Sequence, residues 1–247
     1  MNEERCIRVR GVERSFGDLH VLRGVDLDVR GGELVALFGP SGSGKTTLLN
    51  LIGALDRPDA GQIEVLGRDI VPLGERRRAR LRRTQIGFIF QGASLLPTYS
   101  ARENIDLALR LPGLGYFERR RRTRAALEAV GLSAWADHLP EEMSGGQRQR
   151  IAIARALALQ PRLVLADEPT SGIDTAATRR VLTLFRGLAQ AEGITFVLVS
   201  HDPLVVDFVD TVYDLLDGQL VQRSTAGPEA EPQPAAGDTI WAASLSD

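Results

Sequence analysis

The stretch that decides the fold reads Gly39-Pro40-Ser41-Gly42-Ser43-Gly44-Lys45-Thr46. It follows a short apolar run, residues 34–38, and opens a segment of helical spacing, residues 45–54. This order of strand, loop and helix is the context that a phosphate-binding loop requires. The glycines let successive backbone amides turn inward, and the helix N-terminus adds partial positive charge. The loop therefore predicts a polyphosphate ligand, and the competing interpretation is an ordinary Gly/Ser turn before a helix.

Lys45 is the only lysine in the chain, although Lys and Arg together number 30. A compact ammonium fits a tight nest of amides better than a planar guanidinium does. We therefore expect Lys45 to contact the outer phosphates, and the hydroxyl of Thr46 is a suitable ligand for Mg²⁺.

Two acids, Asp167 and Glu168, end a second apolar run, residues 163–166. An acid at the end of a buried strand is costly unless it meets a metal or a partner, so Asp167 is predicted to hold Mg²⁺ through water. Glu168 precedes Pro169, which favours an extended backbone and predicts that Glu168 orients and deprotonates the attacking water. A solvated acidic turn is the alternative. His201 ends another apolar run and is predicted to lie at the edge of the same site, near the γ-phosphate.

A second glycine-containing stretch, Met143-Ser144-Gly145-Gly146-Gln147, precedes a helical segment, residues 147–159. Ser144 is a good helix cap, and the glycines leave amides exposed at a positively polarised helix end. The stretch is therefore either a second anion-binding end or only a capped helix.

Periodicity predicts an α/β protein with a mainly parallel sheet, because strands and helices alternate along much of the chain. The predicted strands are residues 7–10, 25–30, 34–38, 63–65, 86–90, 163–166, 195–200, 212–216 and 219–221, the last two joined by an Asp217-Gly218 turn. The predicted helices are residues 45–54, 101–110, 119–130, 147–159 and 175–191. Because the helices dominate between Gly92 and Gln160, we expect an inserted helical subdomain there.

Composition indicates a globular protein with a real core: 43% of residues are hydrophobic and 25% are charged. The net charge of −2 gives no bias towards nucleic acid. The chain contains a single cysteine, Cys6, which cannot cross-link the fold by itself and is interpreted as a packing residue in a reducing compartment. His20 and His138 are interpreted as structural. The sequence has no signal peptide core at its start and no apolar run long enough to span a bilayer, so a membrane role needs another chain.

The last residues, 223–247, form a predicted disordered tail, since the chain after Arg223 lacks Lys and Arg and is rich in Pro, Ala, Gly and Glu. Ile240-Trp241 within this tail is either a short docking motif or inert.

These motifs, in this order and spacing, resemble the nucleotide-binding subunit of an ATP-binding cassette (ABC) transporter, over residues 7–221 or so. The resemblance implies a role for each motif. Phe16 would stack on adenine, Gly39 to Thr46 would be the Walker A loop with Thr47 following it, and Gln91 would be the Q-loop glutamine, near Mg²⁺ and the water. Ser144, Gly145, Gly146 and Gln147 would be the signature motif, with Met143 in place of the usual leucine. Asp167 and Glu168 would be Walker B and the catalytic glutamate, Asp174 the D-loop aspartate and His201 the switch histidine.

The resemblance also implies an architecture and partners. The fold would be a P-loop NTPase: a RecA-like core of about residues 1–92 and 160–222 with an N-terminal antiparallel β subdomain, and a helical signature subdomain of about residues 93–159. The protein would be an ATPase that uses ATP and Mg²⁺ and forms a head-to-tail homodimer with two ATP. A transmembrane permease would bind near residues 93–100, which places the subunit peripherally on the cytoplasmic face of the inner membrane.

Several stretches resemble one branch, the ATPases of lipoprotein release, macrolide export and cell division. These are Leu55-Asp56-Arg57-Pro58, residues 86–91, Leu95-Leu96-Pro97, Glu103-Asn104 and residues 165–170. One departure is Ser171-Gly172-Ile173-Asp174, where that branch usually has Gly-Asn-Leu-Asp. Two other functions stay open: a soluble ABC regulator acting on nucleic acid or ribosomes, and a cell-division or wall-hydrolase switch that transports nothing.

Arginine clusters lie at residues 76–83 and 119–124. Each is either a solvated face or a contact with anionic lipid headgroups.

Overall fold

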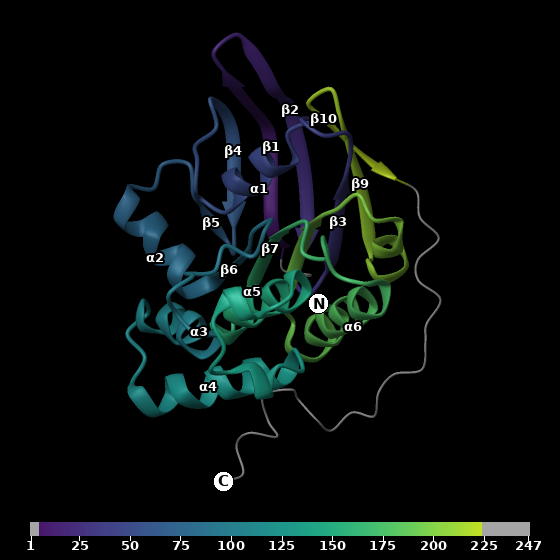
Figure 1. Ribbon diagram of the computed structural model, residues 1–247. Helices are drawn as coiled ribbons and strands as arrows, with labels where there is room; N and C mark the ends of the chain where they lie inside the picture. The colour runs from purple at the N-terminus through teal and green to yellow at the C-terminus, as the bar shows by residue number, and fades with distance from the viewer. Residues whose placement is uncertain (1–4, 224–247) are drawn as a thin grey trace.

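The computed structural model describes residues 5–223, and its strands form two sheets that meet in the upper half of the view in Figure 1. The predicted tail after Arg223, including Ile240-Trp241, lies outside the described residues. The first sheet has four strands in the order β2-β1-β4-β5, and the second has six in the order β10-β9-β3-β8-β7-β6. The strands are β1 Arg5–Phe16, β2 Leu19–Arg30, β3 Leu34–Phe38, β4 Ala60–Val65, β5 Arg68–Asp69, β6 Ile86–Ile89, β7 Leu163–Asp167, β8 Thr195–Val199, β9 Thr211–Leu216 and β10 Gln219–Arg223.

The pairing confirms the predicted fold class. All strand pairs in the first sheet are antiparallel, whereas the second sheet is parallel except for the β9–β10 hairpin. This is an antiparallel N-terminal sheet beside a mainly parallel core sheet, with helices covering the latter.

β3 is the strand on which the two halves of the core meet. Its five residues are all buried, as an apolar run without alternation predicts for a strand covered on both faces. Leu34, Ala36 and Phe38 pack with the helices below the core sheet. Val35 and Leu37 pack with the N-terminal sheet and with the helix that follows the glycine loop. The loop after β3 is therefore anchored from both sides.

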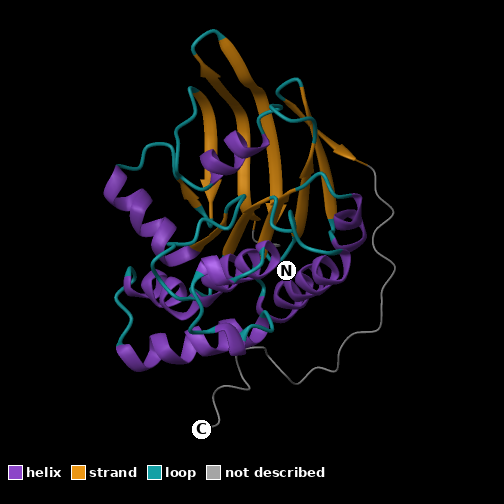
Figure 2. Cartoon of the chain, viewed as in Figure 1, coloured by secondary structure: helices purple, strands orange, loops and turns teal. Residues whose placement is uncertain are grey.

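The helices α3, α4, α5 and α6 lie together in the lower part of the view, and Figure 2 shows how completely helix and strand segregate there. The helices are α1 Lys45–Ile52, α2 Glu75–Gln85, α3 Ala101–Arg110, α4 Tyr116–Ala129, α5 Gly145–Ala158 and α6 Thr175–Glu192, with short 3₁₀ turns at Ser133–Trp135, Pro140–Glu142 and Pro203–Phe208. Ser100, Ser144 and Asp174 cap α3, α5 and α6 through their side-chain oxygens. No helix in the described part of the chain is long and apolar enough to cross a bilayer.

α2 is a helix that the sequence analysis did not predict. It carries the first arginine cluster, which is only partly a solvated face. Arg78 is buried and donates to the backbone oxygens of Ala54 and Asp56, and Arg82 donates to Ala54 O at 2.6 Å. These two arginines therefore hold α2 against the end of α1.

Candidate functional site

Neighbouring parallel strands end at one edge of the core sheet, and the predicted site residues follow them. β7 and β8 are in register to Asp167 and Val199, and β3 pairs with the other side of β8. A cavity of about 440 Å³ lies at this edge. Its lining includes the sequence-predicted residues Phe16, Gly39, Ser41, Gly42, Gly44, Lys45, Thr46, Thr47, Gln91, Asp167, Glu168 and His201.

The glycine loop wraps around the Lys45 side chain. Lys45 Nζ donates to Gly39 O at 2.9 Å and to Pro40 O at 2.7 Å, with the Ser43 hydroxyl at 3.4 Å. Gly39 has φ 145°, and a Cβ there would lie 2.3 Å from the backbone oxygen of Leu215. Only glycine fits at this position, because the loop passes directly over the β9 backbone.

Thr46 and Asp167 join the loop to the end of β7. The hydroxyl of Thr46 donates to Asp167 Oδ2 at 2.7 Å, and Gln91 borders the same cavity. Hydroxyl, carboxylate and amide oxygens are hard donors, and Mg²⁺ takes only one or two protein ligands beside substrate phosphates. The residues present therefore fit Mg²⁺, although no cluster of three or more His, Cys, Asp or Glu occurs in the described chain.

Glu168 and His201 are in direct contact at the lining of the cavity. His201 Nδ1 lies 2.9 Å from Glu168 Oε1, and the glutamate side chain is only 13% exposed while the histidine is 77% exposed. The hydrogen bond that His201 donates to the Glu168 carboxylate, followed by the charge of that carboxylate, raises the pKa of His201 above its ordinary value.

The predicted extended backbone at Glu168 is wrong. Its φ is 51°, in the left-handed region. A turn sets this conformation: Glu168 N donates to Val199 O at 3.0 Å, and Ser171 N donates to Glu168 O at 3.1 Å. Pro169 favours an extended conformation for the residue before it, but the hydrogen bonds to Val199 and from Ser171 outweigh that preference here.

Arg14 is a residue beside Phe16 that sequence reasoning missed. Its guanidinium carbon lies 4.6 Å from the centre of the Phe16 ring, which is half exposed. Asp56 and Asp59 hold Arg14 through hydrogen bonds of 2.7 to 3.1 Å. Strand alternation was the available signal, because residues two apart on β1 point to the same face.

The second glycine stretch and Asp174 lie apart from this cavity, since neither is among its lining residues. Ser144 caps α5 by accepting from Gln147 N at 3.2 Å, and Asp174 caps α6 by accepting from Ala177 N at 2.8 Å. The N–H of Ala177 lowers the pKa of Asp174. The two stretches are neighbours, because a Cβ on Gly146 would lie 3.0 Å from the side chain of Ile173. Within one chain, Ser144 and Asp174 thus act as helix caps.

A P-loop after β3, an acid pair at the end of β7 and a histidine after β8, the strand between those two, are built here on a pair of sheets with inserted helices. Together these features define an ATP-binding cassette. Comparison with known proteins agrees. The profile of the family described as ABC transporter matches residues 22–171. The lipoprotein-releasing system ATP-binding protein LolD 2 of Caulobacter vibrioides is 45% identical over 87% of this chain and 96% of its own length. The macrolide export ATP-binding/permease protein MacB of Marinobacter nauticus is 41% identical over 92% of this chain but only 36% of its own.

Among solved structures, the ATP-binding cassette MJ0796, a dimer in a post-hydrolysis state bound to ADP and phosphate, superimposes with a TM-score of 0.84 at 36% identity. The match covers 90% of this chain and 99% of that one. The chain belongs to the ABC transporter family, as an ATP-hydrolysing ATP-binding cassette of the branch that includes LolD and MacB.

Proposed function

We propose that this chain is the ATPase subunit of a LolD- or MacB-type complex, and that it works on the cytoplasmic face of a membrane against a membrane-spanning partner. The observation that supports this most is the cavity between the glycine loop, Asp167, Glu168 and His201. The names of the relatives describe ATP-binding proteins of lipoprotein release and macrolide export. This chain would couple ATP hydrolysis to a process of the same kind.

In the proposed reaction, Phe16 stacks on the adenine and the amides of residues 39–47 surround the phosphates. Lys45 contacts the outer phosphates. Thr46, Gln91 and Asp167 would hold Mg²⁺, which supplies charge neutralisation on the phosphate oxygens. Glu168 accepts a proton from the attacking water. His201 keeps the Glu168 carboxylate turned into the cavity and donates a hydrogen bond towards the γ-phosphate.

We further propose that each site is completed by a second copy. The polarised N-terminus of α5 is formed by Ser144, Gly145, Gly146 and Gln147. This end of the helix lies apart from the cavity of its own chain. In a head-to-tail pair this end would cover the γ-phosphate bound by the partner, with Asp174 beside it. The core of about residues 1–92 and 160–222 would then bind ATP, and residues 93–159 would carry the closing surface.

The membrane partner would dock beside the Q-loop, in a largely apolar groove of about 600 Å³. Exposed Leu55, Phe90, Leu96 and Leu111 line this groove, which includes part of the predicted contact at residues 93–100. A helix of the permease with an apolar face would fill it.

Glu168→Gln tests the paired site. Without the proton acceptor, ATP stays bound and the dimer should persist, so sizing with ATP should show a dimer that the chain without nucleotide does not form. Glu128→Gln is the matched control, since Glu128 is an exposed residue of α4 and its change removes the same charge. A chain that stays monomeric with ATP, alone and with its membrane partner, would contradict the proposal.

A further inference from the structure

The outer corner of the helical region carries an unusual surface. Phe117 is 84% exposed, the most of any large apolar side chain in the described part of the chain, and Leu111 and Tyr116 are 67% and 60% exposed. All three lie at the α3–α4 connection or in the first turn of α4. We call Leu111, Tyr116, Phe117, Arg120 and Arg124 the α4 corner.

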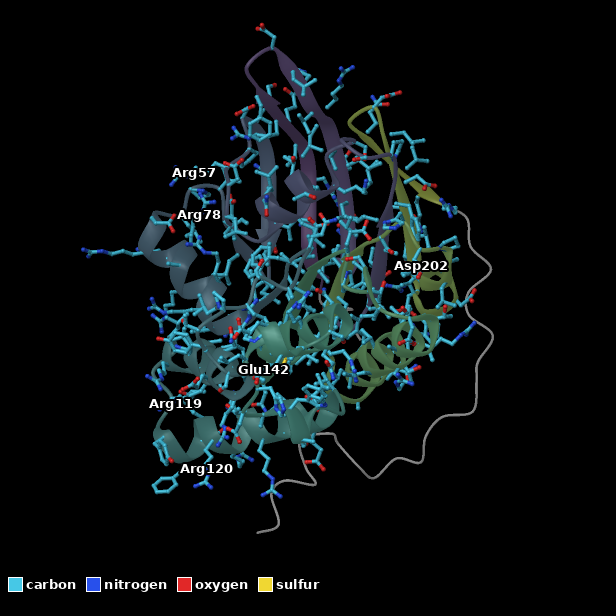
Figure 3. All side chains as sticks on the ribbon, viewed as in Figure 1. Arg57, Arg78, Arg119, Arg120, Glu142 and Asp202 are labelled. Atoms are coloured by element: carbon cyan, nitrogen blue, oxygen red, sulfur yellow. The ribbon has the colours of Figure 1, made fainter. Side chains whose placement is uncertain are left out.

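Helical spacing places the members of this corner on α4 side by side. Tyr116, Arg120 and Arg124 are each four residues apart, and Phe117 precedes Arg120 by three, so all four share one face of the helix. Figure 3 shows Arg120 extending away from the molecule at the end opposite the β1–β2 hairpin.

The other arginines of this cluster are already used within the fold. Arg121 and Arg122 pair with Glu118 at 2.9 and 2.6 Å and lower the pKa of that carboxyl to about 2. Arg119 bonds to Asp106 of α3 at 2.8 Å. Arg120 and Arg124 are exposed, and neither forms an ion pair with any described residue. Their charges are available to a partner.

A groove of about 810 Å³ between α3 and α4 adjoins the corner. Five arginines and three carboxylates line it, together with the apolar surfaces of Tyr116, Leu127 and Ala136. Asp106 is shared by Arg110 and Arg119, and Arg102 pairs with Asp137, so five arginines meet four carboxylates here. The remaining charge is positive and lies beside apolar surface.

We propose that the α4 corner rests on a bilayer surface that contains anionic phospholipid. Arg120 and Arg124 would contact lipid phosphates, and Phe117 and Tyr116 would enter the headgroup layer. Unpaired arginines beside exposed aromatic side chains are the combination that favours the membrane interface. Leu111 also borders the groove proposed for the membrane-spanning partner, so the corner would lie close to the bilayer once that partner is bound. The orientation of the α4 corner towards the bilayer therefore rests on the proposed function, whereas its binding to lipid does not.

Vesicle flotation of the full chain tests this surface. The chain should float with vesicles of phosphatidylcholine and phosphatidylglycerol at low salt, less at high salt, and not with phosphatidylcholine alone. Arg120→Gln with Arg124→Gln should weaken binding roughly 30-fold, since each arginine near an anionic surface contributes about 1 kcal/mol. Phe117→Ser should weaken it as well and leave the salt dependence intact.

Arg76→Gln with Arg77→Gln is the matched control, because both residues are exposed on α2 and the same charge is lost. Equal weakening by this control would mean that overall charge, not the α4 corner, drives binding and would overturn the proposal. So would a failure to float with anionic vesicles. If the Arg120/Arg124 variant instead loses only its membrane protein partner in detergent, the surface binds an acidic protein segment. Glu168→Gln should float like the unaltered chain, because lipid binding does not depend on ATP hydrolysis. A chain that fails to float with anionic vesicles would therefore contradict the lipid-binding proposal and not the proposed ATPase function.

Discussion

At the scale of the residue, Lys45 shows how little room the phosphate loop allows. Its Nζ already lies within 2.9 Å of two backbone oxygens of the loop, where a guanidinium would not fit. We expect Lys45→Arg to lower ATP turnover at least about 100-fold, a loss typical of removing one donor to a reacting oxyanion. The rate of phosphate release measures this turnover. Arg77→Lys, the reverse exchange on an exposed face of α2, should change nothing. Near-normal turnover of Lys45→Arg would refute this interpretation of the loop.

His201 gives a prediction about pH. Because Glu168 raises its pKa, the histidine stays protonated to a higher pH in the folded protein than in the unfolded chain. The contribution of this pair to stability is therefore fully present below about pH 6.5, the ordinary histidine value, and is lost as pH rises through the raised pKa. The gain is small, since His201 is mostly exposed.

An NMR titration of the imidazole protons checks this directly. Glu168→Gln should lower the pKa of His201 towards its ordinary value. A His201 pKa that does not respond to Glu168→Gln would show that the pair does not form in solution.

At the scale of the element, Arg155 connects α5 to the turn that follows Gln91. Gly92, Ala93 and Ser94 are three successive left-handed residues, with φ of 78°, 64° and 46°. Arg155 donates to Ser94 O at 2.8 Å and to Ala93 O at 3.1 Å. Burial lowers the pKa of this guanidinium. The arginine thus holds a backbone conformation that alanine and serine adopt only at a cost.

We expect Arg155→Met to destabilise the protein by about 2–3 kcal/mol, because two carbonyl oxygens lose a charged donor. Urea unfolding measures this loss, and faster amide exchange at residues 92–94 would locate it in the turn after Gln91. Arg179→Met, on an exposed position of α6, is the control. Unchanged exchange at residues 92–94 would mean that the loop holds its conformation without Arg155.

Elements were predictable where burial imposes a pattern. β3 and β8 are buried throughout, β7 is buried except at its last residue, and all three contain short apolar runs. α3 begins and ends as its spacing predicts. α2 was missed because only two of its residues are buried and one of them is Arg78, so no apolar period marks it. The backbone of Glu168 was missed for a related reason: a hydrogen bond to Val199 of the neighbouring strand β8, together with the turn to Ser171, sets its conformation.

At the scale of the whole molecule, the order of strands in the core sheet explains why the site could be assembled from sequence. Residues at the ends of neighbouring parallel strands must meet at one edge, which brought Lys45, Asp167, Glu168 and His201 together. No such rule links Ser144 to that edge, and the structure places it elsewhere. The strand order of one chain therefore does not predict the proposed pairing of two copies, which concerns how the chains assemble.

Complementation between two inactive variants tests that assembly. Ser144→Asp keeps a good helix cap but puts a negative charge where a partner's γ-phosphate would lie. Ser144→Asn is the matched neutral control and should stay active. Lys45→Ala disables the other half of the site. If every site combines the P-loop of one chain with Ser144 of the other, a mixed dimer contains one intact site and one site with both defects.

Each variant alone should hydrolyse ATP slowly, and an equal mixture should recover about one quarter of the unaltered rate, because half of the dimers are mixed and each has one working site. Sizing of tagged chains confirms that mixed dimers form. Full activity of Ser144→Asp alone would show that α5 does not approach a phosphate in any copy. Mixed dimers without recovery would show that Ser144 and Lys45 serve the same site within one chain, which would place closure of α5 over its own cavity, rather than pairing, at the centre of the mechanism.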